Sequence, residues 1–575
     1  MTETSTRPQA SADVTTPVLR VHELEVSYRT GGELRPVLHG DSFTIEPGER
    51  VAIVGESGSG KSTTAAAVLG LLPGSGRITG GRIEFKGEDI TAPTPARLSS
   101  LRGREIGLVP QDPMSNLNPV LKVGRQIAET LAAHGLATGA AARERAIELM
   151  GEAGIPDAAR RARQYPHEFS GGMRQRVLIA IGLACQPELL IADEPTSALD
   201  VTVQRQILDH LETLRAARGT SLMLITHDLG LAADRADKVV VMSAGRIVEA
   251  GPAAEILRRP QADYTKRLVS AAPSVATARA QFGGEHSSGS HAVDPAAGSA
   301  VHADPAAEPE RAEIVLDAKN LTKRYKLRGQ RGQQVVAVDD ISFTVRRGST
   351  TAIVGESGSG KTTTAQMVLG LEKPTSGEVL VNGEVVETAR GARRRAIRRA
   401  MQPVFQDPYG SLNPTFSIEN IIDEPLRVFR VGDRASRRRR VGELLDQVSL
   451  PHAIAQRRPT ELSGGQRQRV AIARALALDP QIVVCDEAVS ALDVLVQDQT
   501  LNLLKDLQAR LGLTYLFITH DLAVVRLIAE HVLVMKQGKV VEAGTVDDVF
   551  DHPQTDYTTS LLAAIPGAEF FAEQH

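Results

Sequence analysis

The sequence predicts an α/β fold that is built twice along one chain of 575 residues. A glycine-rich loop follows an apolar strand in each half, at residues 55–62 and again at residues 355–362. The polar motifs downstream of the two loops then repeat in the same order and at one common offset. We interpret this as a duplicated domain, because solenoid repeats are much shorter, about 20–50 residues.

Each half is expected to contain the same strands in the same order. The first strand runs into the glycine-rich loop, and a helix starts near Lys61 or Lys361. Continuous apolar runs bounded by polar loops are typical of strands buried on both faces, as in a parallel sheet covered by helices. Functional side chains are then expected at the carboxyl ends of the strands. The predicted strands are residues 51–54, 189–192 and 221–225 in the first half, and 351–354, 482–485 and 515–518 in the second.

Composition divides the chain into four segments. We expect a disordered tail over residues 1–17, a first domain over 18–273, a flexible linker over 274–312 and a second domain over 313–570. The linker is rich in Ala, Gly, Ser, His and Pro, so it cannot bury enough apolar surface to offset its ordering entropy. About 125 residues separate the first and second strands of each half, and their helical pattern leaves room for an inserted helical subdomain.

Composition also argues against several classes of protein. The net charge of −3 gives no electrostatic footprint for nucleic-acid binding, so no nucleic-acid partner is expected. The first residues lack a signal-peptide core and no run of 18 apolar residues occurs, so we expect no membrane span. The 2 cysteines, Cys185 and Cys485, cannot form a disulfide framework, which fits a cytoplasmic location.

Both glycine-rich loops fit G-x-x-x-x-G-K-[ST], a pattern whose backbone N–H groups cradle phosphates. Their lysines would reach the β- and γ-phosphates of ATP, and Ser62 and Thr362 would place a hydroxyl on Mg²⁺. An ordinary glycine turn is disfavoured because the pattern follows a buried strand twice. The prediction becomes two tandem P-loop (RecA-like) nucleotide-binding domains with ATP and Mg²⁺ as cofactors. The loop residues expected to bind nucleotide are Gly55, Ser57, Gly58, Gly60, Lys61, Ser62 and Thr63, and Gly355, Ser357, Gly358, Gly360, Lys361, Thr362 and Thr363.

An Asp-Glu pair ends the second strand of each half. Asp193 and Asp486 are placed to present a carboxylate to Mg²⁺. Glu194 and Glu487 follow directly, and a carboxylate there can position or deprotonate an attacking water. A solvated acidic turn is the alternative interpretation.

Two further motifs repeat at the same offset. His227 and His520 follow the third strand in Thr-His-Asp and are expected to contact the γ-phosphate, although a single His there is more often structural. Ser170 and Ser463 each precede two glycines, and each serine is expected to be the N-cap of a helix. Exposed N–H groups there would form a second anion-binding helix end, and a merely capped helix is the alternative.

Together these motifs resemble the nucleotide-binding domains of ATP-binding cassette (ABC) proteins, over about 500 residues. In that family the Ser-Gly-Gly segment of one domain completes the ATP site of the other. The resemblance implies that Ser463 and Gly465 complete the first site and that Ser170 and Gly172 complete the second. It also implies that Gln111 and Gln406 sense Mg²⁺, that Tyr28 and Tyr325 stack on adenine, and that Asp200 and Asp493 link the two sites. The implied Mg²⁺ ligands are Ser62, Gln111, Asp193, Thr362, Gln406 and Asp486.

The segments that begin at Gln111 and Gln406 resemble the ATPases of oligopeptide and dipeptide importers. So do the tails Asp-Tyr-Thr at Tyr264 and at Tyr557. Many members carry a cysteine cluster after this tail that holds an iron–sulfur centre; no cysteine stands there in this chain, so no such centre is expected. Met173 replaces the usual Gln, and Ala488-Val489 replaces Pro-Thr, but neither removes a group that the chemistry needs.

The resemblance implies a peripheral ATPase on the cytoplasmic face of the membrane. Its expected partners are two membrane permease subunits and an extracellular solute-binding protein, and its two domains would pair within the chain. The alternatives are a soluble tandem ATPase acting on the ribosome and a tandem sugar-import ATPase. The resemblance also extends to nickel, opine and oligosaccharide importers, so peptides are only the favoured substrate. The arginine-rich stretches 393–399 and 437–440 are interpreted as solvated helix faces, with contact to anionic lipid headgroups as the alternative.

Overall fold

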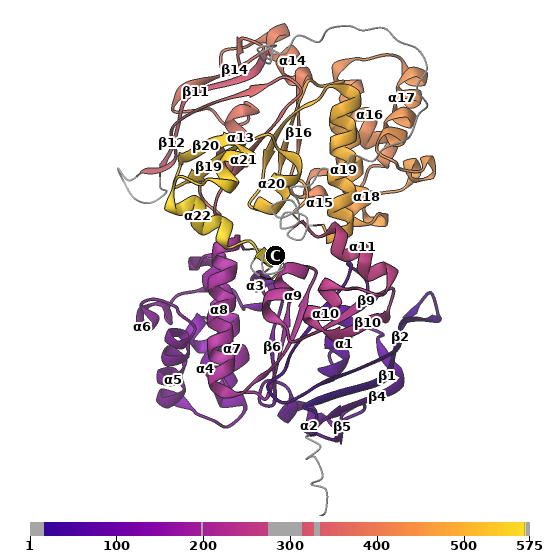
Figure 1. Cartoon of the computed structure of the whole chain (residues 1–575), viewed down its shortest axis with the longest axis vertical. Helices are drawn as coiled ribbons and strands as arrows, with labels where there is room; N and C mark the ends of the chain where they lie inside the picture. Colours follow the sequence, from indigo (N-terminus) through magenta and orange to yellow (C-terminus); the bar gives the residue numbers. More distant parts are fainter. Residues whose placement is uncertain are drawn as a thin grey trace, which may run out of the picture. The chain divides into compact units, whose positions relative to one another are not determined.

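The computed structural model describes residues 16–196, 199–273, 313–326, 334–490, 492–568 and 570. The chain forms two compact units, Met1–Leu199 with Val203–Val269, and Asp200–Thr202 with Ser270–His575 (Figure 1). The predicted linker and all but the last two residues of the predicted tail lie outside the described residues. The exact domain boundaries therefore stay predictions.

A six-stranded sheet forms the centre of the first unit, in the order β10-β9-β3-β8-β7-β6. The first five strands along the chain are parallel, and β10 is antiparallel to β9. The three strands predicted from the sequence are adjacent here, and their residues are almost entirely buried. The strands are β3 (Arg50–Val54), β6 (Ile106–Val109), β7 (Leu189–Asp193), β8 (Ser221–Thr226), β9 (Lys238–Ser243) and β10 (Arg246–Pro252).

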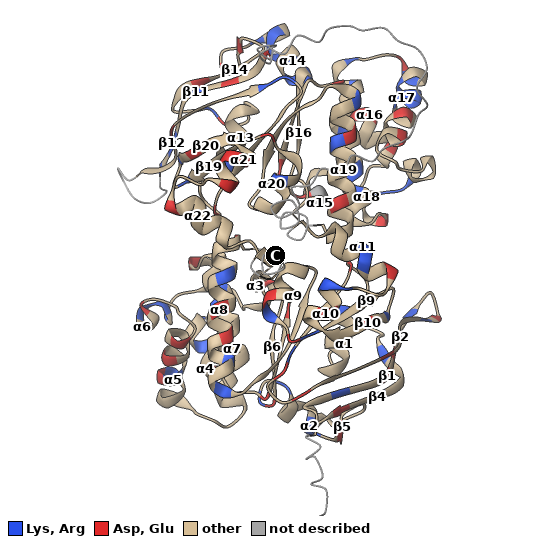
Figure 2. Cartoon of the chain, viewed as in Figure 1, with Lys and Arg blue, Asp and Glu red and all other residues tan. Residues whose placement is uncertain are grey.

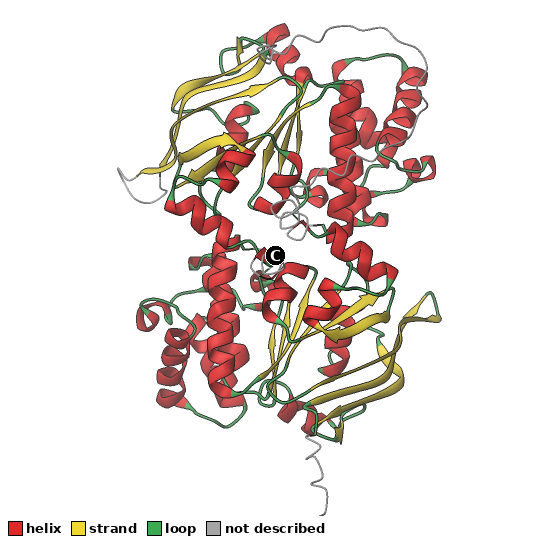
Figure 3. Cartoon of the chain, in the orientation of Figure 1, coloured by secondary structure: helices red, strands yellow, loops and turns green. Residues whose placement is uncertain are grey.

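Helices cover this sheet, and one group forms the expected helical insertion (Figure 3). Within the insertion, α4 and α5 share one apolar core with α7 that includes Ile127, Leu131 and Leu149. The helices are α1 (Lys61–Val68), α2 (Pro95–Leu101), α3 (Pro113–Asn116), α4 (Val123–Ala133), α5 (Gly139–Glu152), α6 (Ala158–Arg161), α7 (Gly171–Leu183), α8 (Val201–Arg218), α9 (Leu229–Arg235), α10 (Ala253–Arg258) and α11 (Asp263–Ala271).

Each unit also contains an antiparallel sheet that was not predicted. In the first unit its order is β2-β1-β4-β5. Its long strand β1 bends at an irregularity between Val21 and Leu24, where Glu23 has a φ of 46°. This interruption breaks the alternation of buried and exposed residues that signals a half-buried strand. The strands are β1 (Leu19–Thr30), β2 (Glu33–Ile45), β4 (Arg77–Phe85) and β5 (Glu88–Asp89).

The second unit repeats this architecture, with sheets β16-β17-β18-β13-β19-β20 and β12-β11-β14-β15. Its strands are β11 (Ile314–Lys326), β12 (Gln334–Arg346), β13 (Thr350–Val354), β14 (Ser376–Val381), β15 (Glu384–Val385), β16 (Met401–Val404), β17 (Ile482–Asp486), β18 (Thr514–Ile518), β19 (His531–Lys536) and β20 (Lys539–Thr545). Its helices are α13 (Lys361–Val368), α14 (Gly391–Ala400), α15 (Pro408–Ser411), α16 (Ile418–Phe429), α17 (Arg434–Gln447), α18 (Gly464–Leu476), α19 (Val494–Leu511), α20 (Leu522–Ile528), α21 (Val546–Asp551) and α22 (Asp556–Ala563).

The two arginine-rich stretches fall on helices α14 and α17 (Figure 2). The arginines of α14 are exposed. On α17, Arg437 forms an ion pair with Asp423 at 2.7 Å and Arg440 with Asp479 at 2.5 Å. Among the described residues, no helix combines the length and the hydropathy needed to cross a bilayer. Cys485 is fully buried in β17, and burial raises its pKa to about 12.

Candidate nucleotide site in each unit

The glycine-rich loop connects β3 to α1 in the first unit and β13 to α13 in the second. Gly55 has a φ of 152° and Gly355 a φ of 147°. A Cβ atom at either position would collide with a backbone carbonyl, that of Met242 or Met535. Only glycine therefore lets the loop turn this close to the neighbouring strand.

The loop lysines close each loop from inside. Lys61 Nζ donates to the carbonyls of Gly55 at 2.7 Å and Glu56 at 2.8 Å. Lys361 Nζ makes the same two bonds, at 2.7 and 2.9 Å, and burial lowers its pKa. Each loop thus holds a buried ammonium beside the N-terminus of a helix, an arrangement that favours an anion such as phosphate.

Each glycine-rich loop, called the phosphate loop below because of the role predicted for it, also contains a buried polar atom without a hydrogen-bond partner among the described residues. The buried hydroxyls of Ser59 and Ser359 find no hydrogen-bond partner among the described residues. Leaving a buried hydroxyl unpaired costs about 1–3 kcal/mol. Equivalent orphans in both loops indicate that the loops suit a polar group that is not part of this chain.

Glu194 and Glu487 stand immediately beyond β7 and β17 in a strained conformation. Their φ values are 43° and 48°, in the left-handed region that residues other than glycine rarely adopt. The backbone N–H of Glu194 still donates to Ile225 on the neighbouring strand at 2.9 Å, and that of Glu487 to Ile518 at 2.9 Å. Such strain persists where surrounding structure holds it, and it is frequent at active sites.

Two side chains hold the carboxylate of Glu194. Gln111 Nε2 donates to its Oε2 at 2.7 Å, and His227 Nδ1 lies 3.1 Å from its Oε1. Burial raises the pKa of Glu194, but the bond from His227 and the nearby positive charges outweigh burial, so the net pKa is lowered. Burial lowers the pKa of His227, and the carboxylate reverses this, so its net pKa is raised. The pair is therefore an ionised carboxylate beside a readily protonated imidazole.

The second unit repeats this arrangement closely. Gln406 Nε2 donates to Glu487 Oε2 at 2.6 Å, and His520 Nδ1 lies 3.3 Å from Glu487 Oε1. The pKa values of Glu487 and His520 shift in the same directions, with burial and the contact between the two side chains as the leading causes. The structure thus brings the predicted Gln, Glu and His together within each unit.

The aspartates adjoin these glutamates at the strand ends. Ser62 Oγ donates to Asp193 Oδ1 at 3.2 Å, and burial raises the pKa of Asp193. Burial also raises the pKa of Asp486, to about 6, and its buried Oδ1 has no partner among the described residues. A hydroxyl, a carboxylate and an amide oxygen are hard donors that suit Mg²⁺. In the part of the chain described, no cluster of three or more His, Cys, Asp or Glu side chains could hold a metal, so Mg²⁺ would also need nucleotide or water oxygens.

The Ser-Gly-Gly segments begin helices α7 and α18, as predicted. Ser170 accepts a bond from the N–H of Met173 at 3.4 Å, and Ser463 accepts one from Gln466 at 3.3 Å. Only the second cap is reciprocal, since the Gln466 side chain accepts from the N–H of Ser463 at 3.1 Å. Ser170 and Ser463 are exposed.

Gly172 and Gly465 also have a packing role that sequence reasoning missed. A Cβ at Gly172 would lie 2.7 Å from Val203 on α8. A Cβ at Gly465 would collide with Val496 on α19. The glycines therefore allow α7 and α18 to pack closely against the helix that follows the Asp-Glu strand.

The remaining predicted residues lie elsewhere in each unit. Tyr28 on β1 is half-buried, and its ring covers Gly76. Tyr325 on β11 is 37% exposed, with Lys323 Nζ 5.0 Å from the ring centroid. Asp493 caps α19 by accepting from the N–H of Val496 at 3.1 Å. Asp200 accepts a bond from Thr202 at 2.9 Å.

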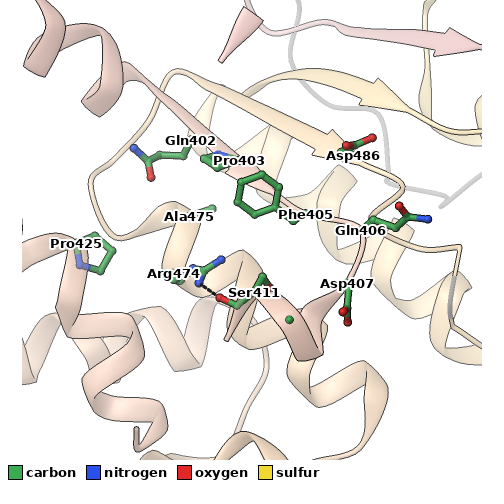
Figure 4. A pocket seen from close by; sticks show the side chains of 11 residues that line it. Gln402, Pro403, Phe405, Gln406, Asp407, Ser411, Pro425, Arg474, Ala475 and Asp486 are labelled. Atoms are coloured by element: carbon green, nitrogen blue, oxygen red, sulfur yellow. Dashed lines mark hydrogen bonds between the residues drawn. The ribbon is translucent and has the colours of Figure 1, made fainter. Parts of the chain in front are cut away.

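A cavity of about 550 Å³ lies beside Gln406 in the second unit (Figure 4). Arg474 of α18 reaches into its wall and donates to the carbonyl of Ser411 at 2.5 Å. Burial lowers the pKa of Arg474. Gln406 and Asp486 line the same cavity, so it adjoins the predicted nucleotide residues.

The family model for ABC transporters matches residues 38–197 and 338–490. The chain belongs to the ABC transporter family. A second family model, described as the oligopeptide/dipeptide transporter C-terminal region, matches residues 248–296 and 541–573. The prediction of an ABC protein of the peptide-importer type, with two tandem nucleotide-binding domains, is confirmed. This ABC protein hydrolyses ATP, as its two cassettes indicate.

Curated relatives match the ABC chain over nearly its whole length. The oligopeptide transport ATP-binding protein OppD of Mycobacterium bovis is 43% identical, covering 96% of this chain and 98% of the relative. The peptidoglycan transport ATP-binding protein YejF of Agrobacterium fabrum is 43% identical, covering 96% of each. The glutathione import ATP-binding protein GsiA of Salmonella choleraesuis is 41% identical, covering 96% of this chain and 90% of the relative.

Proposed function

We propose that this chain is the ATP-hydrolysing motor of an importer for peptides or peptide-like solutes. The observation that carries the proposal is the double match to the oligopeptide/dipeptide C-terminal region, once behind each cassette. The three relatives support it, because their names assign them to the transport of oligopeptides, peptidoglycan and glutathione. Nothing in these matches favours a ribosomal or sugar-import ATPase.

Glu194 and Glu487 are the proposed catalytic bases in this account. Each carboxylate is ionised and held by a Gln and a His, so it can orient a water molecule and accept its proton. His227 and His520 would contact the γ-phosphate from the opposite nitrogen of the ring.

The phosphate loops would bind the triphosphate through backbone N–H groups and through Lys61 or Lys361. Mg²⁺ would be held by Ser62, Asp193 and Gln111, and by Thr362, Asp486 and Gln406. When bound, this ion would neutralise charge that develops between the β- and γ-phosphates. As the family resemblance implies, the exposed serines at Ser170 and Ser463 would each supply a nucleotide contact from the start of a helix.

The proposed partners are two permease subunits and an extracellular solute-binding protein, with this chain on the cytoplasmic face of the membrane. The cavity beside Gln406 supports a permease contact, since a residue that holds the catalytic glutamate also lines it. A permease segment seated there would move Gln406 and with it the carboxylate of Glu487. The sequence resemblance also covers importers of nickel, opines and oligosaccharides, and these solutes are the alternative substrates.

Affinity purification of the full chain from its native membrane tests the proposal. Two permease subunits and a solute-binding protein are expected to co-purify, and peptides are expected to stimulate ATP hydrolysis by the reconstituted complex. Lys61→Ala with Lys361→Ala is the control variant, because it removes both loop ammonium groups. Recovery of ribosomes in place of permeases would overturn the proposal.

A further inference from the structure

A tyrosine from the C-terminal segment of each unit reaches the phosphate loop. The hydroxyl of Tyr264 on α11 accepts a hydrogen bond from the backbone N–H of Glu56 at 3.2 Å. The hydroxyl of Tyr557 on α22 accepts the same bond from Glu356, also at 3.2 Å. These tyrosines belong to the repeated Asp-Tyr-Thr tails, and both lie in the matched C-terminal region.

In both units a glutamate carboxylate accepts backbone N–H groups just before the tyrosine helix, α11 or α22. Before α11, the carboxylate of Glu249 accepts from the N–H groups of Gln261 at 2.8 Å and Ala262 at 3.0 Å. Before α22, Glu542 accepts from Gln554 at 2.7 Å and from Thr555 at 3.2 Å. Each glutamate lies on the last strand of the central sheet, so both tyrosine helices are anchored to the sheet.

A cationic side chain lies over the ring of each tyrosine. Lys536 Nζ lies 4.4 Å from the ring centroid of Tyr557, and Arg267 lies 5.9 Å from that of Tyr264. The hydroxyl of Tyr557 also donates to the carbonyl of Met535 at 3.5 Å, the carbonyl that leaves no room for a Cβ at Gly355. Burial raises the pKa of Tyr557 to about 12, so the hydroxyl keeps its proton for this bond.

One peptide unit connects the tyrosine to the loop lysine. The N–H of Glu56, which donates to Tyr264, belongs to the Gly55–Glu56 peptide. The carbonyl of this same planar peptide is that of Gly55, which accepts from Lys61 at 2.7 Å. Tyr557, the Gly355–Glu356 peptide and Lys361 are connected in the same way. Because a peptide is rigid, a rotation that breaks the bond to the tyrosine also moves the carbonyl that holds the lysine.

We propose that Tyr264 and Tyr557 are positioning residues of the two nucleotide sites. Each fixes one peptide of the phosphate loop and, through it, the ammonium of Lys61 or Lys361. The C-terminal segment is thereby part of each nucleotide site and sets its affinity for ATP. This inference rests on the proposed phosphate-binding role of the two lysines.

The test removes both hydroxyls with Tyr264→Phe and Tyr557→Phe in the full chain. Each site loses the neutral hydrogen bond between the tyrosine hydroxyl and the phosphate-loop N–H, and the second site also loses the bond from Tyr557 to the carbonyl of Met535, while the rings remain. The KM for ATP is therefore expected to rise about 2- to 10-fold. The kcat is expected to stay close to that of the wild type, and the thermal midpoint is expected to fall no further than in the control variant described below. This split between KM and kcat separates positioning from a general loss of structure.

Tyr515→Phe is the matched control. Its buried hydroxyl donates to the carbonyl of Leu504 at 2.9 Å, at the end of β18 away from the loop. This variant is expected to lower the thermal midpoint and leave the KM unchanged. An equal rise in KM in the control, or an unchanged KM in the double Phe variant, would overturn the inference.

Two further variants distinguish failure of the inference from failure of the proposed sites. Lys61→Ala with Lys361→Ala is expected to abolish ATP hydrolysis. If it does so while the Phe variants keep the wild-type KM, only the positioning role of the tyrosines is wrong. If the lysine variants hydrolyse ATP normally, the proposed phosphate-binding role is wrong and the inference falls with it.

Discussion

Gln111 donates a hydrogen bond of 2.7 Å to the carboxylate of Glu194. This bond joins a segment that begins at the edge strand β6 to the residue proposed as catalytic base. A displacement of the Gln111 segment therefore changes how the carboxylate is held. The same relationship between Gln406 and Glu487, at 2.6 Å, provides one such connection in each unit.

Replacement of the glutamates tests their catalytic role. Glu194→Gln and Glu487→Gln keep the side-chain volume but remove the base. Each is expected to lower ATP hydrolysis, and the double variant to lower it by about 100-fold or more, since general-base catalysis contributes about 10²–10⁴-fold. Steady-state release of phosphate measures this, and ATP binding should persist. A silent single variant would mean that its site is regulatory only.

The close packing of Gly465 makes a prediction about stability. Gly465→Ala introduces a methyl group that collides with Val496 and is expected to lower the free energy of unfolding by about 1–3 kcal/mol. Adding Val496→Ala provides space for the methyl group and is expected to restore part of that stability. Urea unfolding of both variants, with Val496→Ala alone as the control, measures the coupling. Additive effects of the two substitutions would contradict the proposed contact.

The caps of α7 and α18 differ at one side chain. The Gln466 side chain accepts a hydrogen bond from the N–H of Ser463. Met173 stands at the equivalent position in α7 and has no oxygen that could accept one from the N–H of Ser170. Met173→Gln is expected to complete a capping box and stabilise the first unit by about 0.5–1 kcal/mol. Met173→Leu keeps an apolar side chain and serves as the control. Equal thermal midpoints for the Gln and Leu variants would show that the reciprocal bond does not form.

The ion pair between Arg50, at the start of β3, and Asp237 predicts that the free energy of unfolding depends on pH. The hydrogen bond from Arg50 lowers the pKa of Asp237. A depressed carboxylate pKa stabilises the fold above the unfolded pKa of about 3.9, and this contribution is lost as the pH falls through the folded pKa. Asp237→Asn is expected to cost less than about 1 kcal/mol at pH 7, because the pair is partly exposed.

Urea unfolding at several pH values checks this prediction. The difference between Asp237→Asn and the wild type should be constant between about pH 5 and pH 7 and should shrink below about pH 4. A difference that grows as the pH falls below 4 would contradict the assigned shift.

The sequence predicted the buried parallel strands and the position of the glycine-rich loops well. Buried apolar runs such as residues 221–225 are strong signals, and all their residues are buried in β8. The loops were predictable because few residue types satisfy their backbone geometry, as Gly55 illustrates. The antiparallel sheets were missed because bulges, such as the one at Glu23, interrupt the alternation.

Tertiary contacts within the site were harder to predict than the motifs. The tails around Tyr264 and Tyr557 were recognised only as a resemblance, since no local pattern tells that their hydroxyls reach Glu56 and Glu356. The left-handed conformation of Glu194 was likewise not predictable, because glutamate has no preference for it. Both features depend on contacts between segments distant in sequence.

ATP-driven uptake of a labelled peptide into vesicles tests the central claim most directly. The vesicles would contain the co-purified permease complex with this chain, supplied with the solute-binding protein. Uptake is expected to require ATP and to be lost when Glu194→Gln and Glu487→Gln are combined. Peptide uptake that continues at the wild-type rate in this double variant would contradict the account.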